Sequence, residues 1–206
     1  MAGENNLEVE VKFLIEDLAQ MQLRLAEAGA KIKKPRVHER NVRFDTADQA
    51  LLAKEQLLRL REDSGVLLTF KGLSALDKQS EAKIREEIEV QLDSFDKMAA
   101  ILSRLGYSPQ QTYEKYRETF ELGEVEVVVD EMPYGNFVEL EGREDALKTA
   151  ARALGLNWEE RIVSNYLALM GYLIQHYDLP FDDVTFANFE ASKVSIRDIL
   201  PLVPQS

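Results

Sequence analysis

Glu8-Val9-Glu10-Val11-Lys12, near the N-terminus, is the stretch of sequence that decides the fold. Side chains of a β-strand point alternately to opposite faces, so Glu8, Glu10 and Lys12 share one face and Val9 and Val11 the other. Half-solvated antiparallel strands commonly have one charged face, and a single copy of this pattern indicates no more than that. The pattern carries more weight because it recurs along the chain.

Two later predicted strands repeat the Glu-x-Glu arrangement, at positions 87–89 and 139–141. Each is followed by a segment with helical spacing of apolar residues that ends at a glycine, at 95–105 and at 144–154. Within a strand, each pair places two carboxylates about 7 Å apart, the rise of two residues. The intervals between the three Glu-x-Glu motifs are unequal, so we interpret the recurrence as a weak internal sequence similarity rather than as a solenoid repeat.

Cations follow the same alternation in a predicted hairpin. Residues 57–61 and 66–71 flank a turn-rich tetrapeptide, and Arg59, Arg61 and Lys71 share the polar face of the pair. Like charges that face each other across strands destabilise a sheet. The cluster therefore predicts nearby anions, from the protein itself or from a ligand.

One face of the predicted sheet collects charges of both signs, and the other face is apolar. The charged residues are Glu8, Glu10, Glu87, Glu89, Asp130, Glu139 and Glu141 with Lys12, Arg59, Arg61, Lys71, Arg85, Lys115 and Arg117. Amphipathic helices are expected to cover the apolar face, which leaves the charged face either open to water or curled into a lumen. A closed charged lumen is costly unless water, a metal or an anion fills it, and that cost favours a functional role.

Composition excludes several classes of protein. The 206 residues are 45% hydrophobic and 30% charged, which suits a globular domain with its own core. A formal charge of −12 argues against a general nucleic-acid binder, which needs excess cations. No apolar run has the length of a membrane span, residues 1–6 do not form an export leader, and there is no cysteine. We therefore expect a cytoplasmic protein without a nucleic-acid or membrane partner.

Segments outside the charged strands give weaker predictions. The basic run 31–36 is expected to be a solvated connection that leads into a strand over residues 38–45. Residues 162–175 predict a helix whose apolar stripe packs in a core. We expect a main domain over residues 1–174 and a C-terminal extension over 175–206, whose apolar residues either pack on the rest of the chain, form a dimer contact or act as a lid.

Further motifs follow the first pentapeptide in a fixed order. They are Asn41-Val42-Arg43-Phe44-Asp45-Thr46, Leu58-Arg59-Leu60-Arg61, Leu68-Thr69-Phe70-Lys71-Gly72, Glu87-Ile88-Glu89, Lys115-Tyr116-Arg117, Val129-Asp130-Glu131 and Phe137-Val138-Glu139-Leu140-Glu141. Together they resemble the CYTH superfamily, the triphosphate tunnel metalloenzymes, whose signature is Glu-x-Glu-x-Lys. The superfamily includes class IV adenylate cyclases, thiamine triphosphatases and inorganic triphosphatases. The ordered set, over about residues 5–172, is specific, whereas one pentapeptide alone is not.

The resemblance implies an α+β fold in which an eight-stranded antiparallel β-barrel forms a polar tunnel with helices packed outside. It implies that the triphosphate binds to Arg59, Arg61, Lys71, Lys115 and Arg117, assisted by Lys12 and Arg85. One Mg²⁺ or Mn²⁺ would be held by Glu8, Glu10, Glu139 and Glu141, since hard oxygen ligands select such ions. Candidates for a second metal or for positioning water are Asp130, Glu87 and Glu89. Lys12, Glu87 and Asp130 are thus the candidate catalytic residues.

Two positions are not explained by the resemblance. Family members often carry an aromatic residue where this chain has Arg43, and Glu126 is in phase with Asp130 without an assigned role. Family members often form dimers, and the sequence leaves a homodimer open.

Metal-dependent hydrolysis of a triphosphate is the first functional prediction, with inorganic, nucleoside and thiamine triphosphate all open as substrates. An adenylate cyclase is second, because it must also seat adenine and ribose, and no residues in the sequence indicate a base pocket. A module that binds polyphosphate without turnover would need the cations but could lose the carboxylates, and this chain has both. A purely structural sheet is the remaining alternative, which predicts no ligand-dependent rise in melting temperature.

Overall fold

The computed structural model describes the chain except for residues 1–6, 74–82, 191, 193 and 204–206, and except for the side chains of residues 7, 8 and 83. The predicted role of the Glu8 side chain therefore lies outside the described residues.

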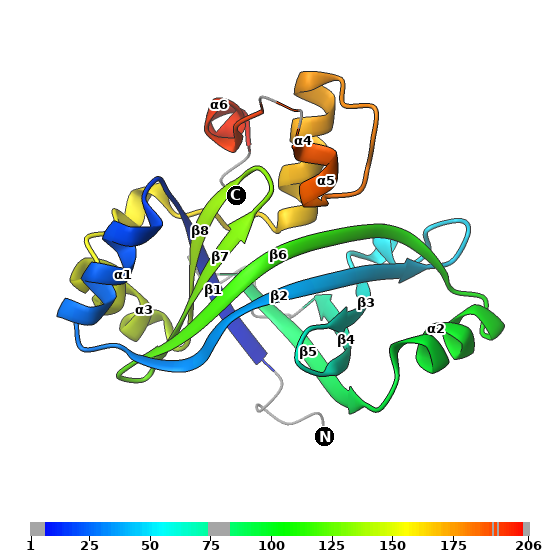
Figure 1. Ribbon diagram of the computed structural model, residues 1–206, viewed down its shortest axis with the longest axis horizontal. Helices are drawn as coiled ribbons and strands as arrows, with labels where there is room; N and C mark the ends of the chain where they lie inside the picture. Colours follow the sequence, from blue (N-terminus) through cyan, green and yellow to red (C-terminus); the bar gives the residue numbers. More distant parts are fainter. Residues whose placement is uncertain (1–6, 74–82, 191, 193, 204–206) are drawn as a thin grey trace.

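Eight antiparallel strands close into a ring (Figure 1). They are β1 (Leu7–Ile15), β2 (Lys31–Asp45), β3 (Leu57–Glu62), β4 (Val66–Leu73), β5 (Lys83–Leu92), β6 (Ser108–Leu122), β7 (Val125–Met132) and β8 (Gly135–Glu141). The order around the barrel is β1-β5-β4-β3-β2-β6-β7-β8. The predicted eight-stranded barrel is confirmed, and so is the choice of a closed charged face over an open one.

The strand register places the charged residues of neighbouring strands beside one another. Glu10 of β1 lies opposite Glu141 of β8, and Lys12 lies opposite Glu139. Because side chains alternate along each strand, the apolar residues between them face outward. In this part of the barrel the interior is therefore charged and the outer face is apolar.

Helices cover the apolar outer face. α1 (Leu18–Glu27) and α3 (Glu144–Ala153) pack with the outer side chains of β1, β7 and β8 in one core. α2 (Phe95–Arg104) packs in a second core with residues of β2 and β3. Asp17 caps the N-terminus of α1, and Ser94 caps the N-terminus of α2. Each side chain accepts a hydrogen bond from a backbone N–H of the first turn of its helix.

The basic run 31–36 is not a loop, so that prediction was wrong. It forms the first part of β2, which continues to Asp45. Register shifts in the pairing with β6 flank Pro35, which lacks a backbone N–H and fits a strand at such irregularities. Lys33 and Arg36 pair with Glu126 and Glu131 of β7, and Lys34 pairs with Asp63 in the turn after β3.

The helix predicted at 162–175 begins later, at Tyr166, and extends to Tyr177 as α4. Ile162 instead exchanges two backbone hydrogen bonds with Lys12 of β1, and the side chain of Asn165 begins the helix by accepting from the N–H of Ala168. The N-terminal end of α4 is thereby attached to the barrel wall.

The C-terminal extension packs against the barrel. It contains α5 (Phe186–Phe189) and α6 (Ile196–Ile199), and short 3-10 turns form at η2 (Leu52–Lys54), η4 (Trp158–Glu160) and η5 (Leu200–Leu202). Apolar residues of α4, α5 and α6 share one core with Tyr113 of β6, Met132 of β7 and Phe137 of β8, which are in phase with the inward-facing residues of their strands. Of the three roles expected for this segment, packing on the barrel is the one observed. Within the described part of the chain, no helix has the length and apolar character needed to cross a membrane.

Candidate active site

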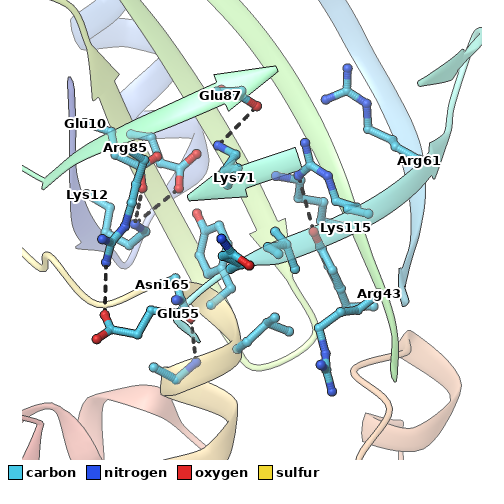
Figure 2. A pocket seen from close by; sticks show the side chains of 18 of the residues that line it. Glu10, Lys12, Arg43, Glu55, Arg61, Lys71, Arg85, Glu87, Lys115 and Asn165 are labelled. Carbon is cyan, nitrogen blue, oxygen red and sulfur yellow. Dashed lines mark hydrogen bonds and ion pairs between the residues drawn. The ribbon is translucent and has the colours of Figure 1, made fainter. Parts of the chain in front are cut away.

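A cavity of about 520 Å³ lies inside the barrel (Figure 2). Every predicted phosphate-binding cation lines it: Lys12, Arg59, Arg61, Lys71, Arg85, Lys115 and Arg117. Five of the predicted carboxylates also line it: Glu10, Glu87, Glu89, Glu139 and Glu141. The fold therefore gathers residues from six strands around one space.

Three carboxylates form a compact group, which we call the acidic triad. Carboxylate oxygens of Glu10, Glu139 and Glu141 all lie within 4.8 Å of one another. The spacing follows from the antiparallel pairing of β1 with β8, where Glu10 and Glu141 are opposite each other. An all-oxygen set of this kind fits a hard divalent cation such as Mg²⁺ or Mn²⁺.

Lys12 lies next to the acidic triad and is almost completely buried, with 1% of its surface exposed. Its Nζ is 3.8 Å from Glu10 Oε1 and 3.5 Å from Glu139 Oε1. Burial lowers the pKa of Lys12, but the charges of the two glutamates outweigh burial and raise the pKa above its ordinary value. Lys12 is therefore a permanently charged ammonium within the cavity.

Asp130 does not join the acidic triad, because other residues occupy its carboxylate. Arg117 donates two hydrogen bonds, at 2.7 Å to Oδ1 and 2.6 Å to Oδ2. Lys115 and the hydroxyl of Tyr166 each donate to Oδ2 at 3.0 Å. Burial, together with the charges of Asp130 and Glu139, raises the pKa of Tyr166 well above its ordinary value, so that the phenol stays protonated. Asp130 thus holds two cations of the cavity wall in place.

Glu39 is a second buried anion, and the sequence reasoning missed it. Its side chain is 1% exposed and lies 3.7 Å from both Arg61 Nη1 and Lys115 Nζ. Burial raises the pKa of Glu39, but Lys115, Arg117 and Arg61 outweigh burial and lower the pKa to about 2. A signal was present, since Glu39, like Arg43, lies in phase along the strand predicted at 38–45.

Glu87 and Glu89 lie on β5, between β1 and β4, and face cations of the hairpin formed by β3 and β4. Glu87 Oε1 is 3.4 Å from Lys71 Nζ, and Glu89 Oε1 is 3.6 Å from Arg59 Nη2. The Thr69 hydroxyl lies between Arg59 and Glu89: it accepts a hydrogen bond from Arg59 Nη2 at 3.1 Å and donates one to Glu89 Oε1 at 2.7 Å. The neighbouring strand β5 thus supplies anions that the clustered cations of the hairpin were predicted to need.

The two unexplained positions both line the cavity. Arg43 lies 3.3 Å from Asp45, whose carboxylate also accepts from the backbone N–H groups of Leu51 and Leu52 at 3.0 Å. Glu126 pairs with Lys33 of β2. Arg43 therefore adds a cation to the wall of the cavity.

A model of the CYTH domain matches residues 6–160 of the chain. The protein belongs to the CYTH family. A Methanocaldococcus jannaschii protein named "putative adenylate cyclase" is 30% identical over 177 residues, which cover 80% of this chain and 99% of that one. CYTH enzymes act on triphosphates and depend on a metal.

Solved structures share the fold of this CYTH protein. A Vibrio parahaemolyticus protein described as a putative adenylate cyclase has a TM-score of 0.71 at 19% identity, covering 81% of this chain and 98% of its own. A Hippeastrum protein described as a putative adenylyl cyclase with a dominant triphosphatase activity has a TM-score of 0.57 at 19% identity, covering 79% and 94%. At these identities the likeness concerns the fold alone.

Proposed function

We propose that this CYTH protein hydrolyses a triphosphate inside its tunnel, in a reaction that depends on a divalent cation. The observation that carries the proposal is the presence, in one cavity, of the acidic triad and of the surrounding lysines and arginines. Cations alone would suit a polyphosphate-binding module, whereas the triad adds ligands for a metal. The combination favours catalysis over simple binding.

The cations bind and orient the polyphosphate chain. Arg59 is fixed by hydrogen bonds to Tyr113 and Thr69, and Arg117 is fixed by the two oxygens of Asp130. Guanidinium groups held in this way present their remaining N–H groups to phosphate oxygens without first losing side-chain freedom. We assign phosphate binding to Arg59, Arg61, Lys71, Lys115 and Arg117, with Lys12 and Arg85.

The acidic triad is the proposed metal site, with Glu10, Glu139 and Glu141 as ligands. A divalent ion bound there would neutralise charge that develops on the phosphate oxygens. Lys12 contributes a second positive charge beside the triad, 3.5 Å from Glu139. A water molecule then attacks the terminal phosphorus, the bond to the bridging oxygen breaks, and orthophosphate leaves the shortened polyphosphate.

The remaining predicted acids receive different roles in this proposal. Asp130 is fully buried behind Lys115 and Arg117, so we assign it to positioning these cations rather than to metal binding. Glu87 and Glu89, on β5, balance the charges of Lys71 and Arg59. They remain the candidates for orienting water.

Adenylate cyclase activity is the second candidate, and the name of the Methanocaldococcus jannaschii relative favours it. In that reaction the ribose 3′-hydroxyl of ATP attacks the α-phosphorus and pyrophosphate leaves. The same cations and the same triad could serve both reactions. The position of the substrate along the tunnel decides which phosphorus meets the nucleophile.

A ³¹P NMR time course with Mg²⁺ or Mn²⁺, run separately on ATP and on tripolyphosphate, tests the proposal. Orthophosphate released from either substrate supports a triphosphatase, and a cyclic phosphodiester with pyrophosphate and no orthophosphate from ATP makes the protein a cyclase. In Glu10→Gln we expect at least about a tenfold higher metal requirement, because one of three ligands loses its charge. Glu159→Gln is the matched control, since the Glu159 side chain is 83% exposed and lies outside the triad. No turnover with any metal would contradict the proposal.

A further inference from the structure

Asn41 of β2 is a buried polar side chain without a partner. Its exposed fraction is 0%, and among the described residues neither its Oδ1 nor its Nδ2 forms a hydrogen bond. Buried amides in folded proteins are nearly always hydrogen-bonded, because an amide that leaves water without a new partner destabilises the fold. A residue that destabilises the protein in this way is a candidate for a role in function.

The strand register places Asn41 behind residues that line the cavity. Asn41 lies opposite Arg61 of β3 on one side and opposite Tyr113 of β6 on the other. Directly opposed residues of antiparallel strands have Cβ atoms about 4.5–5.5 Å apart, so the Asn41 amide is within reach of the Arg61 side chain. Arg61 and Tyr113 line the cavity, whereas Asn41 is not among the described residues that do so. Asn41 therefore belongs to the wall on which a phosphate-binding cation rests.

The contacts that hold Arg61 are long. Its Nη1 lies 3.7 Å from Glu39 Oε1, and its Nε lies 3.7 Å from Asp63 Oδ2, which is too far for a hydrogen bond in either case. In Figure 2, no dashed line joins Arg61 to another side chain that is drawn. Arg59 differs, since two hydrogen bonds fix its guanidinium group. The orientation of the Arg61 guanidinium is thus less firmly determined.

The unused hydrogen-bonding atoms around Asn41 complement one another. Arg61 Nε is a donor and Glu39 Oε2 is an acceptor, and both atoms are buried and lack a hydrogen-bond partner within the described part of the chain. An amide has one oxygen that accepts and one nitrogen that donates. Glu39 is two positions before Asn41 and therefore lies on the same face of β2. Asn41 can accordingly accept from Arg61 Nε and donate to Glu39 Oε2 at the same time.

We propose that Asn41 is a positioning residue for Arg61, and that its two hydrogen bonds form when a triphosphate binds. Phosphate oxygens bind the terminal N–H groups of Arg61 on the cavity side, and the Nε–H group then donates to Asn41, which donates in turn to Glu39. These bonds fix the plane of the guanidinium against the phosphate. The inference rests on the proposed function, because it takes Arg61 as a phosphate-binding residue. The unpaired amide lowers the stability of the ligand-free protein, and ligand binding recovers that loss.

A double-mutant cycle on the full chain tests this inference. Isothermal titration would measure the binding of tripolyphosphate in EDTA, where the metal-dependent reaction does not run, to the wild type, Asn41→Leu, Arg61→Lys and the double variant. Leucine has as many side-chain heavy atoms as asparagine but no polar group, and lysine keeps the charge of Arg61 but has no Nε–H group. We expect Asn41→Leu to weaken binding about tenfold in the wild-type background and to have no effect in the Arg61→Lys background.

Thermal unfolding separates this role from a purely structural one. Without ligand, the melting temperature of Asn41→Leu should equal or exceed that of the wild type, because the variant no longer buries an unpaired amide. Thr119→Val is the matched control for binding, since Thr119 is a buried polar residue of β6 that does not line the cavity. We expect its affinity for tripolyphosphate to be unchanged. If Asn41→Leu does not fold, the smaller Asn41→Ala takes its place in the same cycle.

Three outcomes would overturn the inference. They are an unchanged affinity in Asn41→Leu, an equal weakening by this substitution in both backgrounds, and a lower melting temperature without a loss of affinity. The proposed function fails in a different way, namely if the wild type binds no tripolyphosphate or turns over none of its substrates. Wild-type turnover together with an additive cycle would refute the role of Asn41 alone.

Discussion

Replacing Asp130 by asparagine tests whether this residue holds the cations of the cavity wall. The carboxylate is fully buried and accepts hydrogen bonds from Arg117, Lys115 and Tyr166. Asparagine keeps the size of the side chain but removes its charge. The variant then buries two cations against one anion fewer.

The expected loss in the free energy of unfolding depends on which anions remain beside Arg117 and Lys115 in the variant. Removing one partner from a buried ion pair typically destabilises a protein by about 3–5 kcal/mol. In Asp130→Asn, Arg117 keeps Glu139 at 2.6 Å, and Lys115 keeps Glu39 at 3.7 Å. These remaining contacts place the expected loss at the lower end of that range, about 3 kcal/mol.

Urea unfolding at pH 7 measures the loss, with Asp145→Asn as the control. Asp145 also pairs with an arginine, Arg143, at 3.4 Å, but the two side chains are 73% and 78% exposed. An exposed pair of this kind contributes about 0–1 kcal/mol. If the free energy of unfolding fell by similar amounts in the two variants, the assignment of Asp130 as the residue that positions these cations would be refuted.

Two further predictions concern stability. The pKa of Glu39 falls from 4.5 to about 2 on folding, so the ionised side chain stabilises the protein fully above about pH 5, and this stabilisation is lost as the pH drops toward 2. In Glu39→Gln, the acid-induced decrease in the free energy of unfolding, measured by urea unfolding at several pH values, should be smaller by on the order of 3 kcal/mol. The same decrease in the variant as in the wild type would contradict this prediction. A Cβ on Gly135 would lie 2.8 Å from Ile196 Cγ2, so Gly135→Ala should lower the free energy of unfolding by about 1–3 kcal/mol. Gly171 in α4 has no atom within 4 Å of such a Cβ, so Gly171→Ala should raise the free energy of unfolding by about 0.5–1 kcal/mol. Thermal unfolding measures both changes, and equal melting temperatures of the two variants would argue against the packing of α6 on β8.

Most of the barrel could be predicted because its strands alternate strictly. In residues 7–13 of β1 and 138–141 of β8, charged and apolar residues alternate without interruption, so the face of Glu10 and Glu139 follows from the period of two alone. Residues 31–36 were predicted as a connection and not as a strand, because their polar side chains pair with acids of β7 and of the turn after β3, partners that no local pattern reveals. Glu39 does lie in phase with Arg43 along β2, but this strand has no Glu-x-Glu motif, which is the pattern that indicated the acids of the other strands.

The roles of the acids depend on neighbours in space, which the sequence pattern does not specify. Glu87 and Glu139 belong to identical Glu-x-Glu motifs, yet Glu87 lies across from Lys71, and Glu139 lies beside Glu10 and Glu141. The contribution of α4 to the cavity could not be predicted for a similar reason. Ile162 pairs with Lys12 of β1, and the first turn of α4, just after it in the chain, lines the cavity.

The central claim is that one cavity binds a divalent cation and a triphosphate together. Its most direct test is an anomalous difference map from a crystal grown with Mn²⁺ and a non-hydrolysable triphosphate analogue. We expect an Mn²⁺ peak between the carboxylates of Glu10, Glu139 and Glu141, with phosphate oxygens against Arg59 and Lys115. An Mn²⁺ peak elsewhere, or an analogue bound outside the barrel, would contradict it.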